Sequence, residues 1–309
     1  MAKKSNFQVW LEYALARSVF GFLGMLPRGL AVSLGVAIGG LGFRLLGGLR
    51  RTALKNLEIA FPEKSVEERL KIARGTFENL GRVLGEASQL PKSSVEDIAA
   101  ITEFEFDDEI KGLYRRVKAD KQGVLIVTAH MGNWELFVLA FAALYEPISY
   151  LARPIDNARI EEMVTAFRTR FGNRPINKSG SAMTAIAHLR EGGILGILAD
   201  VNAHPKEGVF VPFFGVDACT PSGPAMIALR SGAVILPAVC VWDKDERKFR
   251  FVRGRLIQPA DTGDRKADIV TTTAEYTAEL ENIIRQYPGQ WMWIHKRWKT
   301  RPKGEPELY

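Results

Sequence analysis

Cysteine and histidine are scarce in this sequence, which narrows what the protein can be. Its 309 residues include two cysteines, Cys219 and Cys240, and four histidines. Two cysteines make neither a disulfide framework nor a zinc quartet, and the N-terminus lacks the features of a cleavable secretory signal. We therefore expect a protein that faces the reducing cytoplasm. At this length we expect one large α/β domain with appendages.

Long basic tracts, zinc-finger spacings and RNP-type aromatic motifs are also missing, although the chain is basic overall. The formal net charge is +7, which favours an anionic partner such as nucleic acid, anionic lipid or an acidic carrier protein. Because the nucleic-acid-binding motifs are absent, we expect no nucleic-acid partner and favour a membrane.

An uninterrupted apolar run of about 20 residues, long enough to cross a bilayer as a helix, is not present either. The segment "GLAVSLGVAIGGLGFRLLGGLRR" comes closest. Trp10 and Tyr13 on one side, with Arg50 and Arg51 on the other, are residue types that anchor a segment at lipid headgroups. We interpret residues 1–50 as a membrane anchor or half-inserted hairpin whose basic pair faces the cytoplasm. The alternative is a buried helical hairpin of a soluble domain.

The pattern of residues 51–309 predicts a helical connector followed by an α/β domain. Pro62 breaks the chain, and Ser65 with Glu68 forms a capping box for a connecting helix. From about residue 101, strand-like runs such as "VLIV", "GILGILA" and "AVILPAVCVW" alternate with amphipathic stretches. This alternation predicts a mostly parallel central sheet covered by helices.

The stretch "TAHMGNWEL" places His130 five positions before Glu135. On one continuous helix these side chains would point about 140° apart, but the flanking residues predict a buried strand, a turn and then a helix. His130 then lies at the carboxyl edge of the sheet, where open α/β folds bind ligands. If Glu135 accepts from one imidazole nitrogen, the other can act as a general base. The alternative is a structural histidine, with Glu135 at the positive end of the helix.

Four stretches in order resemble one known family. "NLEIAFPEKSVEER", "TAHMGNWEL", "GVFVPFFG" and "YPGQWMWIHKRWKTRP" are similar to the bacterial lipid A secondary acyltransferases, the lauroyl and myristoyl transferase group of the glycerolipid acyltransferase superfamily. The resemblance implies transfer of a fatty acyl group from acyl carrier protein or coenzyme A to a hydroxyl of a phosphorylated glycolipid. It also implies a location at the cytoplasmic face of the inner membrane.

The resemblance also implies roles for individual residues. His130 corresponds to the general base and Glu135 to its partner, while Arg153 in "YLARP" and Asp200 in "LADVNAHP" match further blocks. Many members follow that aspartate with glutamine, whereas this chain has Val201, so a hydrogen-bonding group is lost there.

The chemistry of the reaction is consistent with these residue types. A hydroxyl that attacks a thioester must lose its proton as the bond forms, and a histidine with a pKa near 6.5 can accept it at neutral pH. No covalent intermediate is required, and the sequence has no G-x-S-x-G elbow. We expect no cofactor beyond the thioester donor.

Three groups are candidates for holding the oxyanion or the substrate. The backbone N–H groups around Gly132 and Asn133 could stabilise the oxyanion, and Arg153 could do the same or bind a phosphate. Asp200 could contact a substrate hydroxyl or support the site from behind, or simply cap a loop.

The C-terminal stretch "WMWIHKRWK" fits either a headgroup-level surface, which we favour slightly, or a packed cover over the domain. "VFVPFFG" could line an acyl-chain channel or belong to the ordinary core. Other functions are compatible with the residues: acyl transfer to a different glycolipid or a lysophospholipid, a metallohydrolase using His130, Glu135 and Asp200, or a non-enzymatic lipid-binding module.

Overall fold

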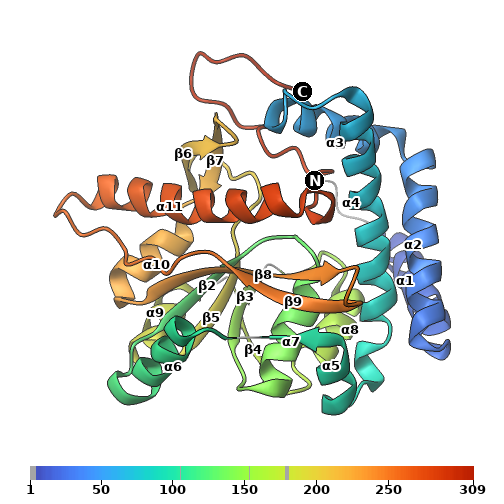
Figure 1. The fold of residues 1–309 in the computed structure, drawn as a ribbon, viewed down its shortest axis with the longest axis horizontal. Coiled ribbons are helices and arrows are strands. Elements are labelled where there is room, and N and C mark those ends of the chain that lie inside the picture. Colours follow the sequence, from blue (N-terminus) through green and yellow to red (C-terminus); the bar gives the residue numbers. More distant parts are fainter. Residues whose placement is uncertain (1–4, 105, 153, 178–180) are drawn as a thin grey trace.

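A mainly parallel seven-stranded sheet forms the centre of the computed structural model, which describes residues 5–104, 106–152, 154–177 and 181–309 (Figure 1). Within these residues the strand order is β1-β9-β8-β2-β5-β3-β4. The strands are β1 (Thr102–Glu103), β2 (Val124–Thr128), β3 (Ser149–Ala152), β4 (Arg174–Asn177), β5 (Ile194–Leu198), β8 (Val234–Asp243) and β9 (Lys248–Arg253). β2 pairs in parallel with both β5 and β8, whereas β9 runs antiparallel to β8. The predicted fold class is confirmed.

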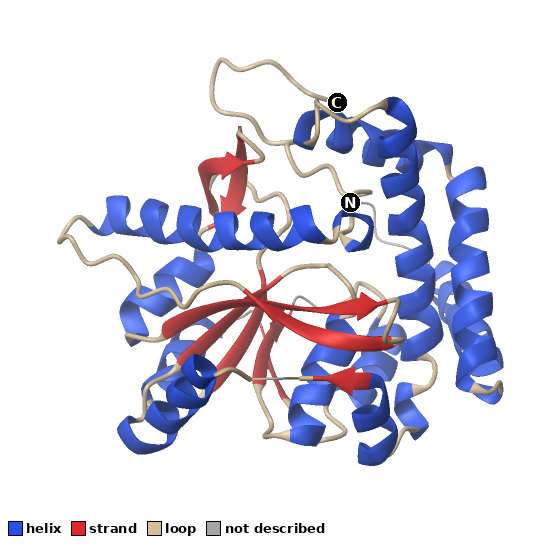
Figure 2. Cartoon of the chain, in the orientation of Figure 1, coloured by secondary structure: helices blue, strands red, loops and turns tan. Residues whose placement is uncertain are grey.

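Helices cover both faces of the sheet (Figure 2). They are α1 (Asn6–Met25), α2 (Arg28–Leu45), α3 (Gly47–Ala60), α4 (Val66–Ala87), α5 (Val95–Ile101), α6 (Asp108–Asp120), α7 (Trp134–Leu144), α8 (Ala158–Arg168), α9 (Ser181–Arg190), α10 (Gly223–Ser231) and α11 (Arg265–Gln286), with 3-10 turns η1 (Leu90–Lys92) and η2 (Pro288–Gln290). A separate hairpin consists of β6 (Gly208–Phe213) and β7 (Val216–Pro221).

Side-chain alternation along β2 explains why both faces are covered. Leu125 and Val127 point into a core shared with α9, α10 and α11. Val124 and Ile126 point into a second core shared with α5, α6 and α7. Because successive side chains of a strand point to opposite faces, an unbroken apolar strand must be buried on both sides.

Helix α2 packs closely on α4 through glycines. A Cβ atom added to Gly35 would lie 2.2 Å from the carbonyl oxygen of Gly81, and one added to Gly39 would lie 2.0 Å from that of Phe77. A side chain at either glycine would force the two backbones apart, so the glycines set the helix separation. Figure 1 shows α2 and α4 side by side at the edge of the domain.

The opposite side of α2 carries an exposed apolar stripe. Leu30, Leu34, Ile38, Leu41 and Leu45 are all exposed, and their spacing places them on one helix face. Among the described residues α2 is the one helix that is long and apolar enough to cross a membrane, with 11% of its span buried. A core helix of a soluble protein can also pass such a test, but it would be mostly buried.

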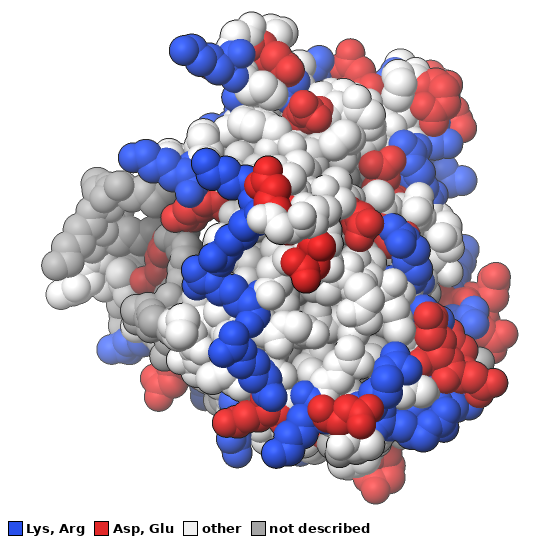
Figure 3. Space-filling model, turned by 90° about the vertical axis from the view of Figure 1, so that its left-hand side faces the viewer, with Lys and Arg blue, Asp and Glu red and all other residues white. Residues whose placement is uncertain are grey.

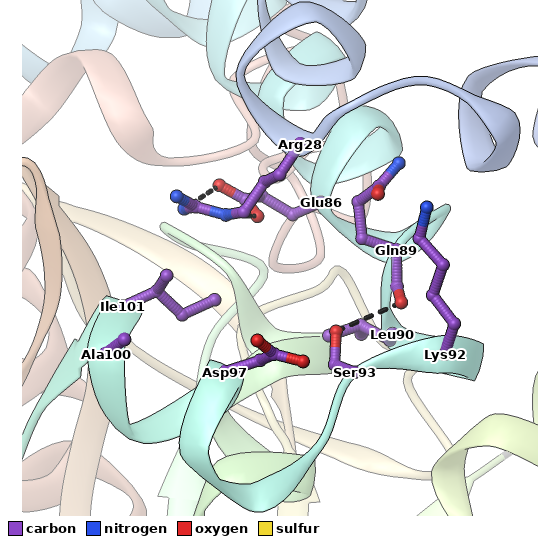
Figure 4. A pocket seen from close by; sticks show the side chains of 9 residues that line it. All are labelled: Arg28, Glu86, Gln89, Leu90, Lys92, Ser93, Asp97, Ala100 and Ile101. Atoms are coloured by element: carbon purple, nitrogen blue, oxygen red, sulfur yellow. Dashed lines mark hydrogen bonds and ion pairs between the residues drawn. The ribbon is translucent and has the colours of Figure 1, made fainter.

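Polar contacts tie the α1–α2 hairpin to the domain (Figure 4). The Arg28 guanidinium donates through Nε to Glu86 Oε2 at 2.8 Å, and Glu86 is buried. Gln89 and Lys92 donate to the carbonyl oxygens of Leu23 and Gly24. Arg28, Glu86, Gln89 and Lys92 are among the residues that line a cavity of about 350 Å³ at the joint between the hairpin and the domain.

Candidate active site

The turn after β2 is shaped by a backbone contact that only glycine permits. Gly132 has a φ of 57°, and a Cβ atom there would lie 1.9 Å from the Cys240 carbonyl oxygen of β8. The next residue, Asn133, donates its N–H to that same oxygen at 2.8 Å. Asn79 of α4 donates to the Gly132 carbonyl at 2.9 Å. The turn is therefore fixed by two neighbouring elements, and it begins helix α7 at a defined position.

His130 forms a hydrogen-bonded pair with Asp200. The imidazole Nδ1 lies 2.8 Å from Asp200 Oδ1, and the backbone N–H of His130 donates to Asp200 Oδ2 at 2.8 Å. His130 follows β2 and Asp200 follows β5, and these strands are parallel neighbours in the sheet. Adjacent parallel strands end at the same edge, so two residues 70 positions apart meet there.

Trp291 is the third member of this arrangement. Its indole Nε1 donates to Asp200 Oδ2 at 2.8 Å, and the whole side chain is buried. The next residue, Met292, donates its N–H to the His130 carbonyl at 3.0 Å. The C-terminal segment therefore orients the carboxylate and supports the histidine backbone.

The pair shifts both pKa values in the direction that stabilises opposite charges. Burial lowers the pKa of His130, but the charge and hydrogen bond of Asp200 outweigh it, so the pKa is raised overall. Burial raises the pKa of Asp200, and the contacts with His130 and Trp291 more than compensate, so its pKa is lowered. An ionised Asp200 holds the neutral imidazole proton on Nδ1, which leaves Nε2 as the basic nitrogen.

The predicted contact between Glu135 and His130 is wrong, because the Glu135 carboxylate binds Arg168 of α8 instead. Arg168 Nε donates to Glu135 Oε2 at 2.7 Å, and a second guanidinium nitrogen donates to Oε1. Trp134 Nε1 donates to Glu135 Oε1 at 3.2 Å, and its ring meets the His130 ring edge-on at 5.3 Å. Glu135 still contributes to the raised pKa of His130 through its charge, after the larger effects of burial and Asp200. Arg168 was not predicted, since nothing in the local sequence marks its partner 33 positions earlier.

The N–H groups of Gly132 and Asn133 are not free to bind an oxyanion, contrary to prediction, because both already donate to backbone carbonyls. Gly132 donates to the Gln290 carbonyl at 3.0 Å and Asn133 to that of Cys240. The Asn133 side chain is fully buried, and its Oδ1 accepts from the Leu136 N–H at 3.0 Å as the cap of α7. Asn133 therefore has a structural role in this turn. Arg153 lies outside the described residues.

A small apolar cavity adjoins this site on the α7 face of the sheet. It has a volume of about 60 Å³, and the side chains around it come from β2, β3, β5, α7 and α8. The side chains of Thr128 and Tyr150 are among those that line it, and the buried Thr128 hydroxyl has no hydrogen-bond partner in the described part of the chain. Gly196 lines the cavity beside Ile126, its register partner in β2. Trp134 and Glu135 connect the cavity to the surroundings of His130.

The C-terminal tryptophans form a packed cover and not the membrane surface that we favoured. Trp291, Trp293 and Trp298 are each at most 1% exposed. Phe213, in the stretch considered as an acyl channel, packs against Trp291 with ring centroids 5.5 Å apart. His295 Nε2 accepts from the Asn202 N–H at 2.9 Å, and burial lowers its pKa. Tryptophan spacing alone could not distinguish burial from a membrane surface.

No group of three His, Cys, Asp or Glu side chains that could hold a metal ion occurs among the residues the structure describes. A histidine–carboxylate pair at the carboxyl edge of an α/β sheet, next to an apolar cavity, is an arrangement chemically able to serve as the general base of an acyltransferase. The sequence comparison identifies the family: residues 2–300 match the model of the bacterial lipid A biosynthesis acyltransferases, and the chain belongs to that family. The resemblance seen in the sequence is confirmed.

Individual relatives cover nearly the whole chain. It is 32% identical to the lipid A biosynthesis lauroyltransferase of Escherichia coli K12, over 97% of this chain and 95% of that protein. It is 29% identical to the palmitoleoyltransferase of the same organism, over 92% and 90% of the two chains. A lipid A biosynthesis acyltransferase of Haemophilus influenzae is 28% identical over 97% and 93%. The protein is therefore an acyltransferase.

Proposed function

We propose that this enzyme moves a fatty acyl group from an acyl thioester to a hydroxyl of a phosphorylated glycolipid, a lipid A precursor. The observation that carries the proposal is the His130–Asp200 pair at the sheet edge of a chain whose family acylates lipid A precursors. The names of the lauroyl- and palmitoleoyltransferase relatives support this substrate class.

His130 acts as the general base in the proposed reaction. Its Nε2 removes the acceptor hydroxyl proton as the oxygen attacks the thioester carbon, and Asp200 stabilises the imidazolium that forms. The carbon–sulfur bond then breaks, and the thiol leaves as thiolate because its pKa is about 8.5. The proton held on His130 can pass to that thiolate, which restores the base. No acyl-enzyme intermediate and no cofactor is required.

The oxyanion needs donors other than the N–H groups of Gly132 and Asn133, because both already donate to backbone carbonyls. The N–H groups of Trp134 and Glu135 lie in the first turn of α7, where a helix has no internal acceptors for them. They lie four and five positions after His130 in the chain, and Asn133 caps the third N–H of the turn. We assign the oxyanion to these two donors.

The apolar cavity takes part of the acyl chain. A cavity of about 60 Å³ holds only a short stretch of an acyl chain. One end of a longer chain then lies in it, and the rest extends beyond its mouth.

We place the enzyme at the cytoplasmic face of the inner membrane, with acyl carrier protein or acyl-coenzyme A as donor. The exposed apolar stripe of α2 supports the membrane location. Both donors are anionic, and the net charge of +7 favours either.

The decisive experiment incubates the purified full chain with a mixture of acyl-carrier thioesters and a lipid A precursor and identifies the products by mass. We expect a precursor heavier by one acyl group, and none with His130→Ala. Transfer to a lysophospholipid and not to the precursor would replace the acceptor in the proposal. Equal transfer by a folded His130→Ala protein would overturn the mechanism.

A further inference from the structure

We propose that a basic groove beside the end of α2 binds the phosphate headgroup of an anionic phospholipid, separately from the reaction site. The groove has a volume of about 830 Å³ and lies between α3 and the C-terminal residues. Arg51, Lys55 and Lys296 line it. No Asp or Glu side chain is among the described residues that line this groove.

The groove is amphipathic in the way a phospholipid is. Leu46, Leu49 and Leu308 line it together with the three cations. Leu46 and Leu49 are 50% and 39% exposed, and they directly continue the exposed stripe that ends at Leu45 of α2. If the stripe faces lipid tails, the cations at its end lie at the depth of the phosphate groups.

Local charges in the groove favour an anion. The start of α3 has no side-chain cap and no acidic residue in its first turn. Of the three cations, Lys55 forms an ion pair with Glu58 at 3.2 Å, and both of these side chains are exposed. An exposed pair of this kind is weak and can exchange its partner.

The groove lies behind the C-terminal segment when viewed from His130. On one side of the segment, Met292 donates to the His130 carbonyl. On the other side, Asn56 of α3 donates through Nδ2 to the carbonyls of Trp293 and His295, each at 2.6 Å. This packed layer includes the buried Trp293. Lys296 and Met292 are four residues apart, at most about 14 Å along the chain.

This arrangement favours a lipid that does not react. A phosphate bound at Lys296 is close enough to fix the distance of the active site from the bilayer surface, yet the packed segment separates it from His130. We therefore assign the groove to a phospholipid of the surrounding bilayer and not to the acceptor.

The test measures lipid binding by the full chain in micelles of a nonionic detergent. Short-chain phosphatidylglycerol or phosphatidylcholine is added in steps, and the rise in unfolding temperature gives an apparent Kd. Each basic residue near an anionic lipid surface contributes about fivefold in affinity, so Arg51→Gln/Lys55→Gln/Lys296→Gln should weaken phosphatidylglycerol binding about 100-fold. Binding of phosphatidylcholine should not change.

A matched control removes the same number of charges from another surface. Figure 3 shows basic side chains in a row on the face where α6, α9 and α10 lie. Arg115, Arg190 and Arg230 belong to these helices and are exposed. The corresponding triple glutamine variant should bind phosphatidylglycerol like the parent. If both triple variants weaken binding equally, the groove has no special role and the inference is wrong.

Two further measurements separate this inference from the proposed function. His130→Ala should lose transfer and keep phosphatidylglycerol binding. The groove variant should keep the parent KM for the lipid A precursor in neutral micelles. A KM raised about 100-fold with unchanged phosphatidylglycerol binding would make the groove the acceptor site and overturn the inference. If the triple variant unfolds, Lys296→Gln alone should weaken binding about fivefold, and parent-like binding by it would also count against the groove.

Discussion

Replacing Asp200 by asparagine tests whether the structure has identified the partner of His130. Asp200 Oδ2 accepts two N–H groups, from the His130 backbone and Trp291 Nε1, and Oδ1 faces His130 Nδ1. An asparagine of the same shape must place its single oxygen at the two N–H donors. Its amide NH₂ then faces Nδ1, which can only accept, so the imidazole proton moves to Nε2.

The variant should therefore fold, but Nε2 of its His130 already carries a proton and cannot accept one from the acceptor hydroxyl. A tautomer inversion of this kind costs about 10⁴ in kcat in a serine protease triad, equivalent to about 5.5 kcal/mol of transition-state stabilisation. We expect a loss of about 10³ to 10⁴ in single-turnover acyl transfer, with thermal unfolding measured beside it. Transfer within tenfold of the parent by folded Asp200→Asn would refute the assignment. A larger loss of the acyl-transfer rate in Glu135→Gln than in Asp200→Asn would also refute it.

The pH dependence carries a further signature of the pair. Only neutral His130 can accept a proton, so kcat/KM should rise with pH to a plateau. The midpoint should lie above 6.5, because Asp200 raises the pKa of His130 against the effect of burial. The same raised pKa means that the stability supplied by the charged pair is complete below pH 6.5 and is lost as pH rises through the folded pKa. A midpoint below 6.5 would contradict this reasoning.

Three other substitutions have defined outcomes. Glu135→Gln breaks the charge pairing with Arg168. Because a charge-assisted hydrogen bond contributes about 1.5–3 kcal/mol, the transfer rate should fall about 10-fold to 100-fold. A rate equal to that of the parent would show that transfer does not need the pair. Gly39→Ala places a Cβ 2.0 Å from a carbonyl of α4 and should lower the free energy of unfolding by about 1–3 kcal/mol. The control Gly40→Ala, whose Cβ would have nothing within 4 Å, should leave it unchanged. Equal melting temperatures of the two variants would contradict the packing argument. Gly196→Val fills the cavity, because a Cβ at this position lies 3.8 Å from the nearest side chain. The products, identified by mass, should then carry shorter acyl chains. An unchanged distribution of acyl-chain lengths would exclude this cavity as the site that binds the acyl chain.

Sequence reasoning succeeded where the relevant information was local. The unbroken apolar run of β2 and the start of α7 placed His130 at the sheet edge, and the structure has both elements. The capping box at Ser65 and Glu68 is present at the start of α4. Each of these depends on residues within a few positions of one another, so periodicity and capping chemistry are enough to predict them.

It failed where the information was the order of strands in the sheet. Glu135 is close to His130 in sequence and was chosen as partner, whereas Asp200 reaches His130 only because β5 pairs with β2. The N–H groups of the turn appeared free because the chain gives no sign that the carbonyls of Cys240 and Gln290 accept from them. For Trp291 the sequence favours a membrane surface. Its contact with Asp200 depends on the C-terminal segment folding back onto the sheet edge, which the sequence does not indicate. The resemblance to the family had indicated Asp200, but not what it binds.

The contacts of Trp291 and Met292 have a consequence for how the enzyme is made. The chain leaves the ribosome from the N-terminus, so α1 and α2 are complete long before the C-terminal segment exists. His130 and Asp200 are both synthesised by residue 200, but the indole that orients the carboxylate and the N–H that supports the histidine carbonyl come about 90 residues later. A nascent chain therefore lacks the complete arrangement of His130, Asp200 and Trp291 until its last residues fold back.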